Sequence, residues 1–416
     1  MARVLIAGAG FAGMWAALGA ARARRDLGAA AADIHIDVVA PTPRLCLKPR
    51  LYERHAAAFE TDIAPLLAAA NVGYVAGTVE AIDAPAGRVT VRMPDSATRQ
   101  EAYDSLVLAM GSHTVPPPAA WRAHIRMLDS TADALDLHRH VTALPQRQPS
   151  PDRYAAAVIG AGFTGLEIAT ELAGWLGDLA RESGEAARVV LLDRAASAGA
   201  TLGEGPREAI AEALALTGVS FRAAASIRRV GPEGILLECG ETIAAATIVW
   251  AAGMRAHPLG ATIGHTDTEG RLSVDVMLRV NGQPRIFAAG DMAKAAAAPG
   301  HATLMSCQHA MPTGRTAGHN ALRVLAGAEP ITYAQPMYVT CLDLGPAGGL
   351  VTHGWERSVL WTGAEAKAVK RIINGRIIAP PPADADRALQ AADPTPLPAV
   401  GPEALADRWR ALLATV

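Results

Sequence analysis

The chain has 416 residues, of which 50% are hydrophobic and 19% are charged. This length gives room for about two or three domains with sizeable cores. With 38 Lys and Arg against 40 Asp and Glu, the net charge is -2, so the composition offers no basic footprint for nucleic acid. The 4 cysteines stand far apart and form no C-x-x-C pair. This spacing argues against a disulfide framework and a structural zinc site, and it indicates a reducing compartment.

Residues 4–21 form an uncharged run directly after Arg3, a pattern that signal peptides and membrane spans share. Glycines at positions 8, 10 and 13 would weaken a spanning helix. The same glycine spacing recurs far inside the chain, where no export signal lies. The sequence therefore predicts neither a signal peptide nor a membrane span in this run.

The N-terminal part of the chain predicts a β-α-β unit. Residues 2–7 are typical of a short buried strand, residues 8–13 of a turn, residues 14–25 of a helix, and residues 34–39 of a second strand. A strand, a crossover helix and a parallel strand of these lengths form the basic unit of a nucleotide-binding sheet.

A second copy of this pattern begins at residue 155. Residues 155–159 predict a strand, residues 160–165 a turn, residues 166–181 a helix, and residues 188–192 the returning strand. Both turns read G-A-G-F-x-G. Because each such unit cradles one pyrophosphate, the repeat predicts an α/β protein with two Rossmann-like dinucleotide-binding domains and a small C-terminal segment.

Each glycine of the turn has its own physical reason. Gly8 permits the tight turn, Gly10 lets the backbone approach a phosphate, and Gly13 lets helix and strand pack closely. The helix N-terminus then faces the negative charge of the ligand. The corresponding residues of the second copy are Gly160, Gly162 and Gly165.

The two copies differ at the position where an acidic residue is expected to bind the adenosine ribose. In the second copy, Asp193 follows the returning strand, which favours NADH over NADPH, although the adjacent Arg194 is a residue type that accommodates a 2′-phosphate. In the first copy the corresponding residue is Ala40, so the ribose contact there has to come from elsewhere.

Further apolar runs predict strands at residues 89–92, 105–109, 244–252 and 285–289, and residues 307–325 predict a helix. The proline-rich residues 379–401 predict an extended linker, because proline removes donors and fixes the backbone away from helix. Residues 402–416 predict an amphipathic helix. Its apolar face would consist of Leu405, Trp409, Leu412 and Val416.

Several motifs stand in a characteristic order along residues 2–375. Besides the two glycine turns, they are P-R-L-Y at 49–52, G-T-V at 77–79, A-M-G at 109–111, V-W-A-A-G at 249–253 and I-F-A-A-G-D at 286–291. This set resembles the two-dinucleotide-binding-domain flavoproteins. Within them it resembles the type II NADH dehydrogenases, which are NADH:quinone oxidoreductases, and their sulfide:quinone relatives.

The resemblance implies that the first turn holds FAD and the second holds NADH. The FAD-binding domain would comprise residues 1–118 and 268–330, with an NADH-binding domain at 119–267 inserted and a C-terminal domain at 331–416. Beyond the six glycines of the turns, the residues expected to bind a cofactor are Phe11, Ala12, Lys48, Val79, Ala109, Gly111, Phe163, Thr164, Asp193, Gly253, Gly290, Asp291 and Ala310.

Two residues are expected to take part in the reaction itself. Glu167 resembles the family's acidic residue near the nicotinamide, and its other interpretation is a first-turn Glu that complements the helix dipole. Gln308 fills the first of two Gln positions in the family's quinone segment, whereas Pro312 replaces the second. His309 is either a proton donor or a packing residue.

The implied activity is a relay in which NADH reduces FAD and the flavin passes electrons to a quinone-like acceptor. A thiol- or sulfide-active enzyme using Cys46 or the pair Cys307 and Cys341 remains an alternative, as does a slow redox sensor. Residues 367–373 and the final helix would contact either a membrane surface or another subunit, including a second copy of the chain. The expected location is the cytoplasm, with peripheral contact at the inner face of the membrane.

Overall fold

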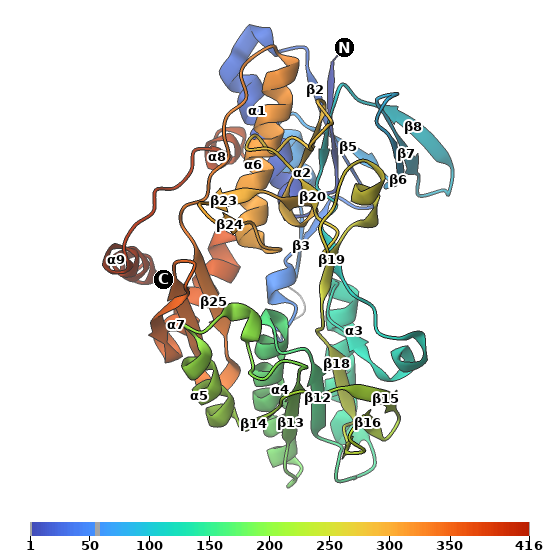
Figure 1. Ribbon diagram of the computed structural model, residues 1–416, viewed down its shortest axis with the longest axis vertical. Helices are drawn as coiled ribbons and strands as arrows, with labels where there is room; N and C mark the ends of the chain where they lie inside the picture. The colour runs from blue at the N-terminus through green and yellow to red at the C-terminus, as the bar shows by residue number, and fades with distance from the viewer. Residues whose placement is uncertain (1, 55–58, 416) are drawn as a thin grey trace.

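The computed structural model describes residues 2–54 and 59–415. Its first sheet is five-stranded and parallel, and it occupies the upper half of Figure 1. The strand order is β21 (Ile286–Ala288), β9 (Ser105–Leu108), β1 (Arg3–Ala7), β2 (His35–Ala40) and β5 (Gly73–Ala76). A strand from late in the chain thus completes a sheet begun at the N-terminus, as expected for a domain interrupted by an insertion.

The second sheet is also five-stranded and parallel, and it lies in the lower half of Figure 1. Its order is β11 (Arg126–Met127), β18 (Thr247–Trp250), β12 (Ala155–Ile159), β13 (Arg188–Leu192) and β14 (Val219–Arg222). The central strands of both sheets are buried, as their continuous apolar sequences require. The expected α/β class with two Rossmann-like sheets is confirmed.

Two long helices lie side by side on the first sheet: α1 (Phe11–Leu27) and α6 (Cys307–Leu325) (Figure 1). Glycines let their backbones touch, because a Cβ atom at Gly19 would overlap the carbonyl of Arg315 and one at Gly318 would overlap that of Ala16. The other helices of the two sheets are α2 (Ala64–Ala69), α3 (Thr131–Ala143), α4 (Phe163–Glu182) and α5 (Arg207–Thr217).

Both glycine turns end earlier than the sequence pattern predicts. Helices α1 and α4 begin at Phe11 and Phe163, so the F-x-G part of each motif is the first turn of a helix rather than a loop. Gly10 and Gly162 are the extended residues that precede each helix. The last glycine of each motif is therefore held rigidly against the strand before it.

Small antiparallel ladders border the two sheets, and one connects them. In the connecting ladder, β10 (Ser112–Thr114) pairs with β19 (Met254–Ala256), so both crossings between the sheets run together. The other ladders are β3 (Arg44–Cys46) with β4 (Glu60–Asp62), β6 (Thr78–Asp83) with β7 (Arg88–Arg92) and β8 (Thr98–Ala102), β15 (Ile227–Gly231) with β16 (Gly234–Leu237) and β17 (Thr242–Ile243), and β23 (Ala296–Ala298) with β24 (His301–Ala302).

A third sheet forms the C-terminal part and lies beside α4. It consists of β25 (Val339–Asp343), β26 (Gly349–His353) and β27 (Ser358–Thr362), and it is covered by α7 (Gly363–Ile372) and a π-helical turn (Ile373–Ile377). The last helix, α9 (Pro402–Leu413), packs Leu405 and Trp409 against α7. Leu412 does not share this buried face, because 39% of it is exposed, and Val416 lies outside the described residues.

The prediction of an extended linker over residues 379–401 is wrong in its middle, where α8 (Ala385–Ala391) forms. Asp384 caps this helix by accepting a 2.9 Å hydrogen bond from the backbone N–H of Arg387. Ala388 and Leu389 are buried in the core under α1. The prolines flank the helix rather than interrupt it, so composition alone misjudged the segment.

Two expectations about membranes meet different outcomes. Over the described ranges, no helix combines the length and apolar character needed to cross a bilayer. The expectation that residues 367–373 form an outer surface is wrong for Lys370 and Ile372, which are buried. Their side chains pack inside the chain and do not form part of its outer surface.

Candidate functional site

The first glycine turn is closed on both sides by backbone. Gly8 has a φ of 112°, and a Cβ atom there would overlap the carbonyl of Ala109, while one at Gly13 would overlap the carbonyl of Gly8. Beside Gly10, by contrast, a Cβ would meet no described atom within 4 Å. The turn is therefore packed where helix and strand must meet, and open where a phosphate would lie.

The second turn repeats this geometry with different partners. Gly160 has a φ of 103°, and a Cβ atom there would lie 2.7 Å from the carbonyl oxygen of Ala251. A Cβ at Gly165 would overlap the carbonyl of Gly160. Among the described residues, no side chain caps the N-terminus of α1 or α4, so the first N–H groups of both helices can receive an anion.

The remaining residues of the two turns lie beside these N-termini. Phe11 and Phe163 are the partly exposed first residues of α1 and α4, and Thr164 is exposed. Gly111 and Gly253 take left-handed conformations, with φ of 69° and 76°, at the two crossings between the sheets. These positions fit a pair of dinucleotide sites that face the junction of the two sheets.

The I-F-A-A-G-D segment at 286–291 contacts the first glycine turn directly. A Cβ atom at Gly290 would lie 2.7 Å from Cβ of Ala12 and 3.3 Å from Cβ of Ala310. The backbone N–H of Gly290 also donates to Oγ1 of Thr313 over 2.9 Å. Three segments far apart in the sequence, at the starts of α1 and α6 and after β21, thus converge on one point.

Asp291, next to that point, is partly buried and accepts a 2.6 Å hydrogen bond from Oγ of Ser112. Burial raises its pKa, against the opposing influence of this hydrogen bond and of Lys48. Lys48 donates to the backbone oxygen of Ser112 over 3.1 Å and pairs with Asp129 over 2.9 Å. The structure therefore brings Lys48 and Asp291 to one polar cluster, which fits the hydroxyl-rich chain of FAD.

Ala40 is the last residue of β2, beside the first glycine turn, and only its backbone can form hydrogen bonds. Its carbonyl oxygen accepts hydrogen bonds from Tyr74 Oη over 2.8 Å and from the N–H of Gly77 over 3.0 Å. Val79 is buried in the core below this edge. Because residue 40 is an alanine, this position provides no carboxylate for a ribose.

Asp193 lies at the equivalent edge of the second sheet, where its carboxylate is held by backbone. One oxygen accepts from the N–H of Ala161 over 2.7 Å and the other from the N–H of Ala195 over 2.8 Å. The acidic group is thus attached to the glycine turn itself. This placement fits the recognition of a ribose without a 2′-phosphate.

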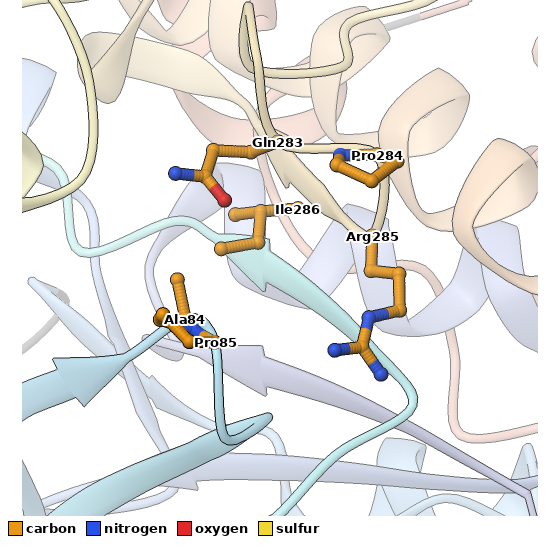
Figure 2. A pocket seen from close by; sticks show the side chains of 6 residues that line it. All are labelled: Ala84, Pro85, Gln283, Pro284, Arg285 and Ile286. Atoms are coloured by element: carbon orange, nitrogen blue, oxygen red, sulfur yellow. The ribbon is translucent and has the colours of Figure 1, made fainter.

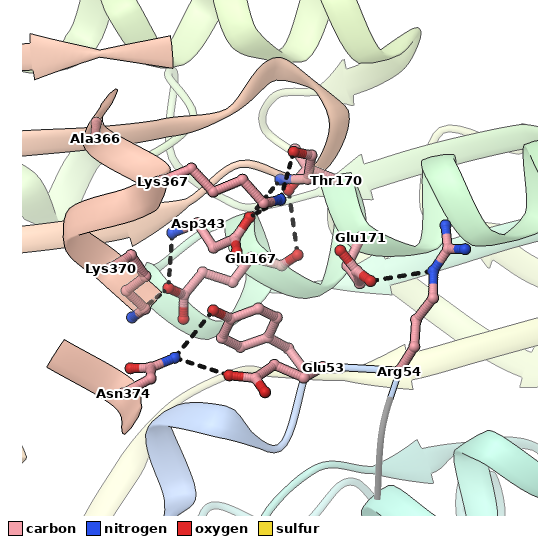
Figure 3. Close-up of polar contacts among 12 residues, drawn as sticks. Glu53, Arg54, Glu167, Thr170, Glu171, Asp343, Ala366, Lys367, Lys370 and Asn374 are labelled. Atoms are coloured by element: carbon pink, nitrogen blue, oxygen red, sulfur yellow. Dashed lines mark hydrogen bonds and ion pairs between the residues drawn. The ribbon is translucent and has the colours of Figure 1, made fainter. Parts of the chain in front are cut away.

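Glu167 does not lie on the surface of α4. It forms a 2.8 Å ion pair with Lys370 of α7, and it accepts from the N–H of Asp343 over 3.1 Å (Figure 3). Burial raises the pKa of Glu167. Burial also lowers the pKa of Lys370, but the neighbouring carboxylate outweighs it and the net shift is upward. An exposed Glu that only complements the helix dipole is not what the structure contains.

A second layer of polar groups surrounds this pair. Lys367 pairs with Asp343 over 2.8 Å, and Asn374 donates to Glu53 over 2.9 Å and to Tyr52 Oη over 3.4 Å (Figure 3). Tyr52 is buried, and burial raises its pKa, so its phenol stays neutral. The Lys370 ammonium lies 5.7 Å from the Tyr52 ring centroid. The P-R-L-Y motif thus contacts α7 and the π-helical turn, which cover the C-terminal sheet.

Gln308 at the start of α6 is engaged with protein backbone. With its amide oriented to satisfy both partners, it pairs with the N–H and the carbonyl of Val339 at the start of β25. Pro312 lies inside α6 and lacks the N–H that would bond the carbonyl of Gln308. That carbonyl instead accepts from Gln335 Nε2 over 3.1 Å. The helix therefore runs through Pro312 without starting there.

His309 is a packing residue. It is 1% exposed, and its Nδ1 lies 2.9 Å from Oε1 of Gln335. Burial lowers its pKa to about 4. At neutral pH the ring is therefore uncharged, which does not suit a proton donor.

Burial raises the pKa of three thiols, those of Cys46, Cys307 and Cys341. Burial raises the pKa of Cys307 to about 11 and that of Cys341 to about 12. Burial also raises the pKa of Cys46, whose Sγ lies 3.5 Å from Oγ1 of Thr131. Because the thiolate is the nucleophile, none of these environments activates a cysteine at neutral pH.

Two other kinds of site find no support. In the part of the chain that the structure describes, no group of His, Cys, Asp and Glu side chains could hold a metal ion. A hollow of about 230 Å³ lies between the turn of Ala84 and Pro85 and the segment before β21 (Figure 2). Its lining contains none of the predicted site residues, so it is a surface hollow apart from the glycine turns.

The geometry defines a class of protein: an oxidoreductase with one dinucleotide site on each of two Rossmann-like sheets, joined at a common junction. The comparisons with known proteins agree. Residues 2–314 match the pyridine nucleotide-disulphide oxidoreductase family, and the chain belongs to this family. The expectation of an oxidoreductase that uses FAD and NADH is thereby confirmed.

The chain is 42% identical over 384 residues to an NADH dehydrogenase-like protein of Mycobacterium tuberculosis, covering 92% of this chain and 95% of that protein. It is 31% identical over 356 residues to a type II NADH:quinone oxidoreductase of the same organism, covering 79% and 74%. Among solved structures, NDH2 from Plasmodium falciparum in complex with NADH has a TM-score of 0.75 at 12% identity, covering 94% and 96%. That last likeness concerns the fold alone.

Sequence reasoning missed Lys370, Asn374 and Tyr52 as neighbours of Glu167. The one local signal was a lysine between apolar residues, in A-V-K-R-I-I, which has the spacing of an inward-facing helix position. Asn374 and Tyr52 carried no signal beyond their motif or position. Only the tertiary structure brings these side chains together.

Proposed function

We propose that this chain is an FAD-dependent NADH:quinone oxidoreductase. The observation that carries the proposal is the convergence of Gly290, Ala12 and Ala310 at the first glycine turn, together with a second glycine turn of the same geometry on the other sheet. One site for a flavin and one for a pyridine nucleotide then face the same junction. The name of the relative that is 31% identical supports a quinone as the acceptor.

The proposed division of labour follows the two sheets. Residues 1–118 and 268–330 would hold FAD, residues 119–267 would hold NADH, and residues 331–416 would border the acceptor. The sheet order supports this division, because β21 returns to the first sheet after the whole second sheet is complete. When bound, FAD supplies the chemistry, taking a hydride equivalent from NADH and passing two electrons to the acceptor.

The protein groups near the start of α6 fit a quinone head group. No side chain in the described part of the chain caps the N-terminus of α6, and the dipole of this helix favours negative charge in front of it. Tyr52 is neutral and buried, and the Lys370 ammonium lies 5.7 Å from its ring centroid. Glu167 fixes the position of Lys370. We assign Gln308 the role of holding β25 in place beside this group.

Peripheral membrane contact and a homodimer are part of the proposal, since a lipid-soluble quinone resides in the membrane. The inward direction of Lys370 and Trp409 means that such a contact would use other residues. Sedimentation with vesicles of anionic phospholipid and size-exclusion chromatography measure these two properties separately.

Steady-state oxidation of NADH tests the acceptor. The purified holoprotein is mixed with NADH and a water-soluble quinone, and then with disulfide and sulfide substrates. The triple variant Cys46→Ser, Cys307→Ser, Cys341→Ser serves as the matched control, because a thiol mechanism would lose its turnover. We expect quinone reduction to persist in the triple variant. Turnover with thiol or sulfide substrates alone would contradict the proposal.

A further inference from the structure

The turn between β26 and β27 contacts two segments that belong to different units of the chain, one containing His301 and the other containing Thr201. Its Trp355 ring is stacked between His301, at 4.4 Å between ring centroids, and Tyr338, at 4.3 Å. The interplanar angles are 5° and 9°. His301 belongs to the β23–β24 ladder, which follows β21 of the first sheet. This side of the turn is therefore fixed to the first-sheet unit.

The other side of the same turn is fixed to the second-sheet unit by Arg357. Its guanidinium donates to the backbone oxygen of Thr201 over 3.1 Å and to Tyr338 Oη over 3.1 Å. Its backbone has a φ of 51°, a left-handed conformation that is uncommon for a residue other than glycine. A Cβ atom at Gly205 would lie 2.5 Å from the Arg357 carbonyl oxygen, so the two backbones are in direct contact.

Thr201 in turn borders the second glycine turn. The N–H of Gly199 donates to the carbonyl of Ala161 over 2.9 Å, and Thr201 Oγ1 is the nearest described atom to a Cβ built at Gly162, at 3.9 Å. The segment that Arg357 holds is thus the wall of the proposed NADH site.

The aromatic stack borders the first site in the same way. His309 lies 5.6 Å from Tyr338 and 5.8 Å from Trp355 between ring centroids. The next residue in α6, Ala310, meets Gly290 of the flavin motif. A continuous chain of contacts therefore runs from the second glycine turn through Arg357, Tyr338 and His309 to the first.

We propose that Arg357 is a positioning residue for hydride transfer, which fixes the NADH-side glycine turn relative to the flavin side. This inference rests on the proposed function. Hydride transfer needs the reacting atoms within about 3–3.5 Å, so a small displacement of one unit against the other slows it strongly. Arg suits the role because its planar group bonds Thr201 and Tyr338 at once while lying 5.5 Å from the Tyr338 ring centroid.

The test compares Arg357→Gln and Arg357→Lys with the control Arg410→Gln. Arg410 also lies over an aromatic ring of the C-terminal part, at 5.8 Å from the Trp361 centroid, but its ion pair is with Asp407 of its own helix. In anaerobic stopped-flow experiments we expect Arg357→Gln to lower the limiting rate of flavin reduction by about tenfold. The apparent Kd for NADH and the rate of reoxidation by quinone should stay as in the wild type, and Arg357→Lys should be intermediate.

Hydrogen exchange supplies a readout that does not depend on turnover. Without NADH, the amides of residues 199–205 should exchange faster in Arg357→Gln than in the wild type or in Arg410→Gln. An unchanged limiting rate, or equal losses in both half-reactions together with a lowered melting temperature, would overturn the positioning role. A wild-type flavin that NADH fails to reduce would refute the proposed function as well, so the two failures are distinguishable.

Discussion

Glu167 and Lys370 form an ion pair of 2.8 Å in which each side chain is only 7% exposed. Glu167 belongs to α4, which opens at the second glycine turn, and Lys370 belongs to α7, which covers the C-terminal sheet. The pair thus joins the proposed NADH unit to the proposed acceptor side. A buried pair of this kind fixes one arrangement more than it adds stability, since desolvation offsets much of its attraction.

Removing one partner of this pair should be more harmful than removing both. We expect Lys370→Met to lower the free energy of unfolding by about 3–5 kcal/mol, because it leaves a buried carboxylate without its partner. The double variant Lys370→Met, Glu167→Gln should recover most of this loss. Chemical denaturation measures both. The control Asp407→Asn, in a pair exposed by 60% and 75%, should change stability by less than about 1 kcal/mol. Equal losses of stability in Lys370→Met and Asp407→Asn would contradict the prediction that the buried pair is more costly to break than the exposed one.

Two glycines of α4 should respond differently to the same substitution. Gly165→Ala places a methyl group on the carbonyl of Gly160 and should abolish NADH binding. Gly177→Ala in the same helix meets open space and should leave binding unchanged, with stability raised by up to about 1 kcal/mol. Isothermal titration with NADH and thermal melting report the two effects. Tight binding by Gly165→Ala would mean that the second turn does not hold the nucleotide.

Asp193 should decide between NADH and NADPH. Its carboxylate accepts from the N–H of Ala161 in the second glycine turn, and in the proposed NADH site it would repel a 2′-phosphate. Asp193→Asn removes the charge but keeps only one acceptor oxygen, so one of the N–H groups of Ala161 and Ala195 loses its partner. We expect the ratio of kcat/KM for NADH over NADPH to fall by about tenfold or more, since one unfavourable charge contact is worth over about 1.4 kcal/mol. An unchanged ratio would mean that a residue other than Asp193 contacts the ribose.

Acid should destabilise the fold through buried histidines. Burial lowers the pKa of His309 from 6.5 to about 4, so the unfolded chain binds a proton that the folded chain does not. Its contribution is present above pH 6.5 and is lost as the pH falls toward 4. His309→Phe keeps a ring beside Tyr338 and Trp355 without a titrating group. Between pH 7 and pH 5, the free energy of unfolding should depend less steeply on pH in this variant, with a slope smaller by up to about 1.4 kcal/mol per pH unit. Melting temperatures measured across this range show the difference in slope. A slope identical to that of the wild type would rule this contribution out.

The nucleotide-binding core follows from local sequence. Strands Ala155–Ile159 and Arg188–Leu192 and helix Cys307–Leu325 have the bounds that their apolar patterns predict. The glycine turns were recognisable because backbone contacts at Gly8 and Gly13 leave no room for a side chain. Such constraints act within a few residues, so a single sequence displays them.

The acceptor side does not follow from local sequence. Whether Lys370 faces inward depends on Glu167, which lies far away in the chain, and on the sheet that places α7 over α4. Helix α8 depends on the surface of α1 that buries Ala388 and Leu389, although prolines surround it. The contact of Arg357 with Thr201 likewise exists only through the fold. Long-range pairs leave no periodic pattern for sequence reasoning to detect.

Anaerobic titration of the purified yellow protein with NADH, followed by addition of a soluble quinone, tests the central claim most directly. We expect one equivalent of NADH to bleach the flavin absorbance per active site, and one equivalent of quinone to restore it. Two results would contradict the account: a protein that binds no flavin after reconstitution with FAD, or a bound flavin that NADH does not reduce.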